Sequence, residues 1–203
     1  MIEDSGLIEN PNVIKPFRGE VVDYPGTGRV VVIIGYHSLE RKWGQIVKEH
    51  FHQNVIDRGG KILFYEIQNS PIETGEESPV VDAQVSRFLK EAGNVEMVID
   101  IHEHPEAKAT RVRNQWSLTT ENGDVASEAR SRIRDLRVLP FDDYSRRKTA
   151  GQNIPYAITD PDLPSGGIDA YVKGQITPQV QKAINDTLSF VVNLSNIQLK
   201  VSS

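Results

Sequence analysis

The sequence predicts an α/β fold in which a mostly parallel or mixed central sheet is flanked by helices in three layers. Three segments rich in β-branched and other apolar residues, 29–35, 61–67 and 95–101, are predicted to be strands. Between them lie two segments, 38–57 and 81–92, with apolar residues at helical spacing. This β-α-β-α-β order is typical of a sheet covered by helices, in which sites form at the carboxyl ends of the strands.

The first strand and the helix after it show the clearest pattern. Residues 30–34 are five consecutive β-branched residues followed by Gly35, as in a strand buried on both faces. We expect the next helix over residues 38–57, with Ser38 as its N-cap and Gly59 beyond its end. The helix after the second strand should stop at Gly93, where the third strand follows directly.

The remaining elements are less regular, apart from the last helix. Thr177 is placed as the N-cap of a long amphipathic helix, with Pro178 at its first position, that runs to about residue 193. Before it we expect an exposed strand, a helix and a short strand, over residues 109–118, 125–137 and 155–159 respectively. Residues 1–28 are predicted to be a loose lead-in with at most one edge strand, and residues 69–79 an irregular loop.

Length and composition limit the classes of protein to which the chain can belong. Its 203 residues fit a single domain spanning 1–203. The net charge of −5 argues against nucleic acid as a partner. The basic residues of 130–137 and 146–148 are interpreted as a solvated face of an element, with contact to an anion as the alternative. No apolar run is long enough for a membrane span, and the acidic start does not resemble a signal peptide, so a cytoplasmic location is expected. The oligomeric state is left open.

Histidine and carboxylate side chains are the strong metal ligands in this sequence, because it contains no cysteine. His37 and Glu40 come just after the first strand, and His102 comes just after the third. In a parallel sheet these strands end at the same edge, so the three side chains should converge there. Three protein ligands with one open position are the arrangement of a catalytic zinc, and we therefore expect one Zn²⁺ per chain. His104 is an alternative ligand.

These two motifs resemble those of a known group, the zinc hydrolases of the carboxypeptidase A-like fold, and especially its succinylglutamate desuccinylase and aspartoacylase branch. The resemblance rests on the strand followed by Gly35, His37 and Glu40, which is similar to the family's Gly-x-His-x-x-Glu motif. It also rests on residues 97–102, which resemble the family's strand ending in Asp-x-His. About half of the chain is covered.

The resemblance implies a carboxypeptidase A/phosphorylase-hydrolase-like fold, with His37, Glu40 and His102 as metal ligands. It implies hydrolysis of an amide or peptide bond in a small acylated amino acid or peptide, by water that the metal activates. The family has a catalytic glutamate at the end of a late strand, where this chain has Asp160. We therefore predict Asp160 as the general base, with Asp162 as the second choice.

Other residues near these motifs have candidate roles in binding or catalysis. Glu103 is a further candidate acid or base, and Asp100 is expected either to accept a ring N–H of a metal-bound histidine or to cap the strand end. The family's Asn-Arg segment has no clear equivalent, so Asn69, Arg111 and Arg113 are the candidates for binding substrate. Together with the aspartate at 160, this departure favours an alternative function as a degenerate, non-catalytic metal-binding or regulatory domain.

Overall fold

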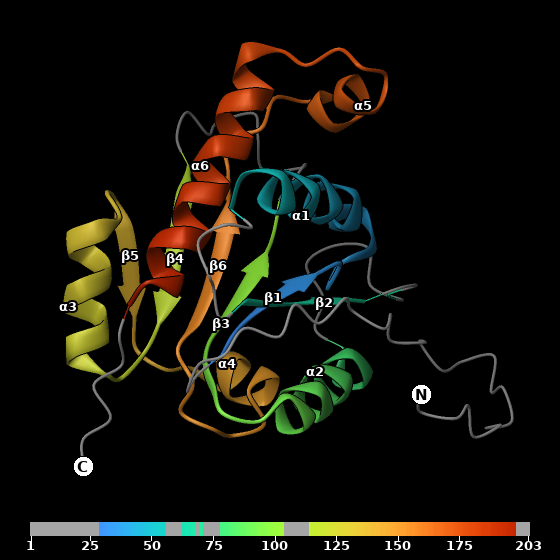
Figure 1. Cartoon of the computed structure of the whole chain (residues 1–203). Coiled ribbons are helices and arrows are strands. Elements are labelled where there is room, and N and C mark those ends of the chain that lie inside the picture. Colours follow the sequence, from blue (N-terminus) through green and yellow to red (C-terminus); the bar gives the residue numbers. More distant parts are fainter. Residues whose placement is uncertain (1–28, 56–61, 68–69, 71–77, 104–113, 198–203) are drawn as a thin grey trace, which may run out of the picture.

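The computed structural model describes residues 29–55, 62–67, 70, 78–103 and 114–197. Its centre is a six-stranded mixed sheet in the order β2-β1-β3-β6-β4-β5 (Figure 1). The strands are β1 (Arg29–Ile34), β2 (Ile62–Glu66), β3 (Val95–Ile101), β4 (Gln115–Thr119), β5 (Leu136–Leu139) and β6 (Tyr156–Asp160). Strands β2, β1, β3 and β6 are parallel, whereas β4 is antiparallel to β6 and carries β5 parallel to itself. The predicted three-layer α/β class is therefore confirmed.

Helices cover both faces of the sheet (Figure 1). They are α1 (Arg41–Val55), α2 (Pro79–Ala92), α3 (Gly123–Arg132), α4 (Asp143–Lys148), α5 (Gly167–Val172) and α6 (Pro178–Ser195), with a short 3-10 helix η1 (Ser38–Glu40) before α1. Helices α1, α3 and α6 share one apolar cluster with one face of the sheet. Helix α2 packs with the other face, and α4 lies beside α2. No helix among the described residues is long and apolar enough to span a bilayer.

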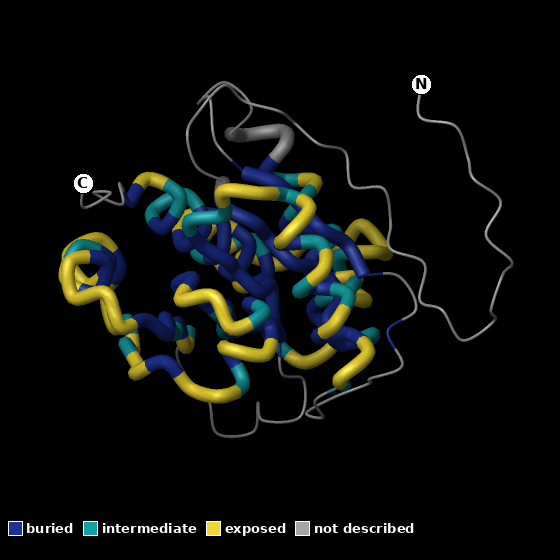
Figure 2. The backbone as a smooth tube through the Cα atoms, turned by 90° about the horizontal axis from the view of Figure 1, so that it is seen from below, coloured by how far each residue is buried: buried dark blue, intermediate teal, exposed yellow. Residues whose placement is uncertain are grey.

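The core explains why the first and third strands were predictable. Side chains alternate along β1, so that Val30, Val32 and Ile34 face α1 and α6, while Val31 and Ile33 face α2. All five are at most 4% exposed. Figure 2 shows the buried backbone concentrated in the sheet, with the exposed residues on the surrounding helices and turns. A strand buried on both faces needs a continuous apolar run, which is what the sequence contains.

The start of the first helix differs from the prediction. His37, and not Ser38, is the N-cap residue, and Ser38 lies inside η1. The backbone N–H of Glu40 donates to the carbonyl of His37 over 3.2 Å, so the chain forms a tight 3-10 turn before α1 begins at Arg41. A similar shift occurs in α2, where Ser78 is the N-cap and Pro79 the first helical residue.

The helix predicted over residues 125–137 was also partly wrong. Helix α3 ends at Arg132, and a turn through Asp135, with φ of 62°, leads into the strand β5. Along β5, the half-buried residues Leu136 and Val138 alternate with exposed residues, and the strand pairs with β4. Pairing with β4 is a tertiary interaction that overrides the helical pattern of the segment. Helices α4 and α5 were not predicted. The lead-in of residues 1–28 lies outside the described residues, and so do residues 109–113, where the predicted strand was expected to start.

Candidate metal centre

The turn after β1 brings the first two predicted ligands together. Gly35 has φ of +76°, and a Cβ atom there would lie 2.8 Å from the carbonyl oxygen of Ile67, so a glycine is required. Ser70 Oγ donates to the carbonyl of the next residue, Tyr36, over 2.6 Å. The chain then reaches His37 in extended conformation and enters η1, which ends at Glu40.

Helix α1 is held closely against the sheet directly behind this turn. A Cβ atom at Gly44 would lie 2.4 Å from Ile34 Cγ2, so only glycine permits this approach. Arg41 Nε and Gln45 Nε2 both donate to Glu66 Oε1, over 2.8 Å and 2.7 Å. These contacts connect the first turns of α1 to the end of β2. They thereby fix the position of η1, which directly precedes α1.

The third predicted ligand is held by the neighbouring strand β6. The backbone N–H of His102 donates to Thr159 Oγ1 over 2.9 Å, and this hydroxyl in turn donates to the carbonyl of His102 over 3.2 Å. Strand β3 lies between β1 and β6, and its parallel pairing with β1 ends with Ile34 beside Ile101. The first residues past both strands therefore leave the sheet at the same edge.

His37, Glu40 and His102 form a compact buried cluster. His37 Nδ1 lies 3.0 Å from Glu40 Oε2, and His102 Nε2 lies 3.1 Å from Glu40 Oε1. The two imidazole rings are 4.9 Å apart between centroids, and one ligand atom from each residue lies within 4.8 Å of the others. The residues are between 2% and 6% exposed. These three residues could hold a metal ion.

The chemistry of the donor set suits a divalent metal such as zinc. Two imidazole nitrogens and a carboxylate are ligands that zinc prefers. One ligand atom from each of the three residues lies within 4.8 Å of the others, so the three side chains are close enough to share one ion. Burial, and next the negative charge of Asp100, raises the pKa of Glu40 to about 10. A divalent cation would offset this cost, because it favours the ionised carboxylate.

We expect a pH dependence of folding in the metal-free protein that originates at Glu40. Its pKa is about 10 in the folded chain and near 4.5 in the unfolded chain, so the folded state holds the extra proton between these values. The contribution of Glu40 to stability is therefore fully present below pH 4.5 and is lost as pH rises toward 10, by at most about 1.4 kcal/mol per pH unit. Urea denaturation of chelator-treated protein from pH 5 to 9 measures this slope.

The matched control for this pH dependence is Glu40→Gln, which keeps the shape of the side chain and cannot ionise. Groups remote from the cluster titrate equally in both proteins, so the difference between the two stability curves reports Glu40 together with His37 and His102, which contact its carboxylate. If the wild-type and variant curves run parallel, the carboxyl of Glu40 is not protonated in the folded protein.

A fully buried lysine lies behind the cluster, and the sequence analysis missed it. Lys148 Nζ lies 3.2 Å from Asp100 Oδ2, and both side chains are 0% exposed. Tyr156 donates its hydroxyl to the same oxygen over 2.8 Å. The ammonium also lies 3.7 Å and 3.8 Å from the ring centroids of Tyr36 and Tyr144, a cation–π arrangement. The last residue of α4 therefore supplies a cation to the interior beside β3.

Charges in this buried group act on one another and on the cluster. Burial alone would raise the pKa of Asp100, but the charges of Lys148 and His102 and the hydrogen bond from Tyr156 hold it below its usual value. Burial lowers the pKa of Lys148, while Asp100 opposes that shift. The Oδ2 atom of Asp100 thus bonds to Lys148 and Tyr156, and no described residue hydrogen-bonds to its Oδ1. Its predicted contact with a ligand histidine stays a prediction.

Two of the three predicted catalytic carboxylates, Asp160 and Glu103, lie at the sheet edge that carries the cluster. Asp160 ends β6 and is 8% exposed, two residues beyond the pair Asp100 and Ile158 that joins this strand to β3. Glu103 directly follows His102 and is 2% exposed. Both therefore lie at the same sheet edge as the cluster. The catalytic roles of both residues stay predictions.

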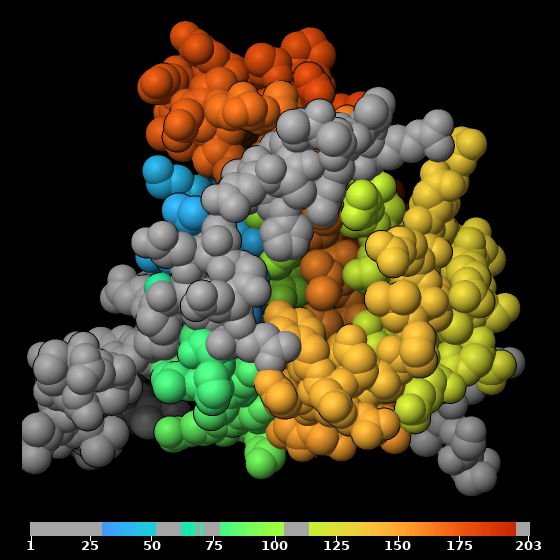
Figure 3. Space-filling view, turned by 180° about the vertical axis from the view of Figure 1, so that it is seen from behind, coloured from blue at the N-terminus to red at the C-terminus, as the bar shows by residue number. Residues whose placement is uncertain are grey.

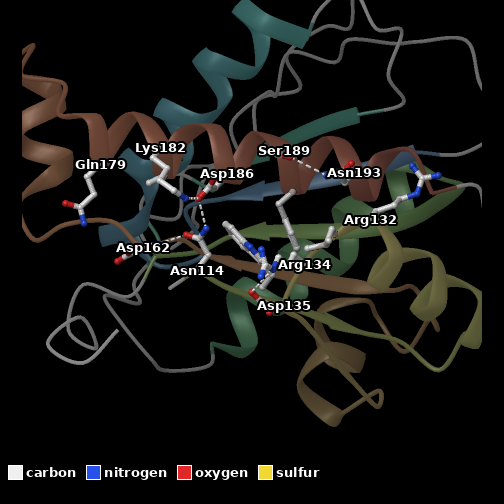
Figure 4. A pocket seen from close by; sticks show the side chains of 14 residues that line it. Asn114, Arg132, Arg134, Asp135, Asp162, Gln179, Lys182, Asp186, Ser189 and Asn193 are labelled. Atoms are coloured by element: carbon white, nitrogen blue, oxygen red, sulfur yellow. Dashed lines mark hydrogen bonds and ion pairs between the residues drawn. The ribbon is translucent and has the colours of Figure 1, made fainter. Parts of the chain in front are cut away.

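Asp162 lies in the wall of a different cavity. That cavity of about 470 Å³ is lined by residues of β4, the turn before β5, and α6. The backbone N–H of Asp162 donates to Asn114 Oδ1 over 2.8 Å, and Figure 4 shows Asn114 between Asp162 and Asp186. The predicted substrate-binding residues Asn69, Arg111 and Arg113 lie outside the described residues, as does the alternative ligand His104.

Comparison with known proteins supports the fold. No family model matches the chain, and no curated protein matches its sequence. Among solved structures, a candidate metallopeptidase from Shewanella amazonensis shares 8% identity at a TM-score of 0.51, over 85% of this chain and 77% of the other. At these identities the likeness is to the fold alone.

Two further solved structures match at lower TM-scores. The archaeal proteasome activator PbaB of Pyrococcus furiosus matches with 12% identity and a TM-score of 0.46, over 88% of each chain. Murine aminoacylase 3 matches with 12% identity and a TM-score of 0.40, over 86% of this chain and 67% of its own. Neither of these two matches bears on the function of this chain, which must be argued from the site.

Proposed function

We propose that this protein is a zinc-dependent hydrolase that cleaves an amide or peptide bond in a small acylated amino acid or peptide. The observation that carries the proposal is the buried cluster of His37, Glu40 and His102 at the carboxyl edge of a mixed α/β sheet. Three side chains that leave one coordination position open define a catalytic rather than a structural zinc site. A bound zinc ion would polarise the amide carbonyl and lower the pKa of water.

The chain's own residues supply positioning and proton transfer. The turn through Gly35 and the hydrogen bonds of Thr159 hold the two histidines in place before a ligand arrives. Asp160, at the end of the strand next to that of His102, would take a proton from the attacking water and return it to the leaving nitrogen. Glu103, beside His102, is the second candidate for this transfer.

Zinc content and hydrolysis test the proposal together. The purified chain is dialysed against a weak chelator, its zinc is measured by elemental analysis, and N-acyl amino acids and short peptides are screened for cleavage. About one zinc per chain and hydrolysis that is lost with a strong chelator and restored by zinc would support it. Zinc below about a tenth of the chain concentration, with no gain on adding zinc, would contradict it.

The assignment of the general base is tested by Asp160→Asn. Loss of a positioned base costs about 10²–10⁴-fold in rate, so kcat should fall at least about 100-fold while zinc stays bound. Glu103→Gln should have the smaller effect on kcat. The control is Asp124→Asn on the exposed start of α3, which should retain full activity. If Glu103→Gln abolishes turnover and Asp160→Asn does not, the two roles must be exchanged.

A non-catalytic, metal-binding domain is the second candidate. It is favoured by one observation, the aspartate at position 160, whose carboxyl is one methylene short of the glutamate that the resemblance implies. Such a domain would bind one zinc through the same three residues and cleave none of the substrates. The two candidates therefore predict the same metal content, and turnover separates them.

A further inference from the structure

A second feature, a cavity of about 350 Å³, is lined in part by residues of the turns that carry the cluster. Its residues come from η1, the start of α1, the end of β3, and the segment that includes α5. Ser38 and Leu39 of its wall lie between the ligands His37 and Glu40 in sequence, and Glu103 of its wall directly follows His102. The cavity and the metal centre therefore share the same two turns.

The walls of this cavity are mainly apolar. Leu39 is 51% exposed although it is a large hydrophobic residue, and it lines the cavity together with Leu163, Pro164 and Ile168. Figure 3 shows the segment that contains the last three of these residues, coloured orange, directly above the start of α1, coloured blue. The volume lies within the roughly 300–1,000 Å³ of ligand pockets, which are typically apolar with few polar groups.

The charges around the cavity narrow the class of ligand. Among the described residues that line the cavity, Glu103 and Asp169 carry carboxylates and Lys42 carries the one positive charge. A charged group on the ligand would lose its hydration on entering this largely apolar space, which is costly. An uncharged aliphatic or aromatic group would instead bury apolar surface against Leu39 and Ile168.

We propose that this cavity is the specificity pocket of the metal centre and that it takes an uncharged aliphatic or aromatic group attached to the scissile amide. The inference rests on the proposed function, because it places the group next to the position where the amide would be cleaved. It goes beyond that function because it excludes substrates in which the group that enters the cavity is acidic. Leu39 and Ile168 are the specificity-determining residues.

A series of hydroxamates bound to the zinc-loaded full chain tests this pocket. A hydroxamate binds zinc through its own oxygens, so the series varies only the attached group. Isothermal titration should show hexanohydroxamate binding roughly tenfold or more tighter than acetohydroxamate, because burial of each methylene contributes several-fold in affinity. Succinate monohydroxamate, which carries a carboxylate, should bind no tighter than acetohydroxamate.

Two pocket variants and a matched control locate the effect. Leu39→Ala and Ile168→Ala should each weaken hexanohydroxamate at least about threefold and leave acetohydroxamate unchanged. Leu139→Ala removes a 36% exposed leucine from β5 and should change the affinity for neither hydroxamate. Equal affinity across the series, tighter binding of succinate monohydroxamate, or no effect of both pocket variants would overturn the inference while the zinc site stands. A chain that binds no zinc would overturn the proposed function and this inference together.

Discussion

Replacement of either histidine of the cluster is expected to abolish zinc binding. His37→Ala or His102→Ala removes one of three protein ligands from a site that is at most 6% exposed, where water cannot easily take its place. Loss of residues that merely orient ligands typically costs 10–100-fold in metal affinity, so loss of a ligand itself should exceed about 100-fold. Competition with a zinc-binding dye measures the affinity, and elemental analysis measures the stoichiometry.

The fold should survive both substitutions. The core clusters contain neither histidine, and the strands that carry them are fixed by residues such as Val32 and Ile99. His50→Ala is the matched control, because His50 lies in α1 and bonds to Tyr171 over 2.8 Å, away from the cluster. It should bind zinc as the wild type does. Stoichiometric zinc in both His37→Ala and His102→Ala would show that the metal is held elsewhere.

The strands and the ligand cluster were predictable because each depends on local sequence. Five β-branched residues before Gly35 specify a strand buried on both faces, and the order of elements specifies that β1 and β3 are parallel. Residues just past such strands must emerge at the same edge, so His37 and His102 could be placed together without coordinates. The position of Glu40 could not be predicted in this way, because the helix that follows its 3-10 turn is held by Arg41 and Gln45, which bond to the distant Glu66.

Lys148 shows what the sequence could not reveal. It follows Arg146 and Arg147, and a run of basic residues is usually a solvated face, as we predicted for it. The structure contradicts this interpretation for Lys148, which is 0% exposed. Its partners Tyr36 and Asp100 are far from it in sequence, and only the packing of α4 beside α2 brings it to them. A local sequence pattern cannot predict a contact between residues that are so far apart in the chain.

The largest loss of stability is expected from Lys148→Met. Methionine fills much of the same space but leaves Asp100 as a buried charge without its cation, and breaking a buried ion pair from one side costs about 3–5 kcal/mol. Urea denaturation of chelator-treated protein at pH 7 measures the change in the free energy of unfolding. Lys182→Met, which removes an ammonium that is 70% exposed from its pair with Asp186, should cost no more than about 1 kcal/mol.

The double variant Lys148→Met with Asp100→Asn separates the loss of the pair from the loss of packing. Asparagine removes the unpaired charge and can still accept the hydroxyl of Tyr156, so the double variant should be more stable than Lys148→Met alone. A double variant that loses the sum of both single changes would mean that Lys148 and Asp100 act independently. Recovery would show that the cation of α4 is needed chiefly to neutralise Asp100, two residues before His102 on the strand that leads to the metal centre.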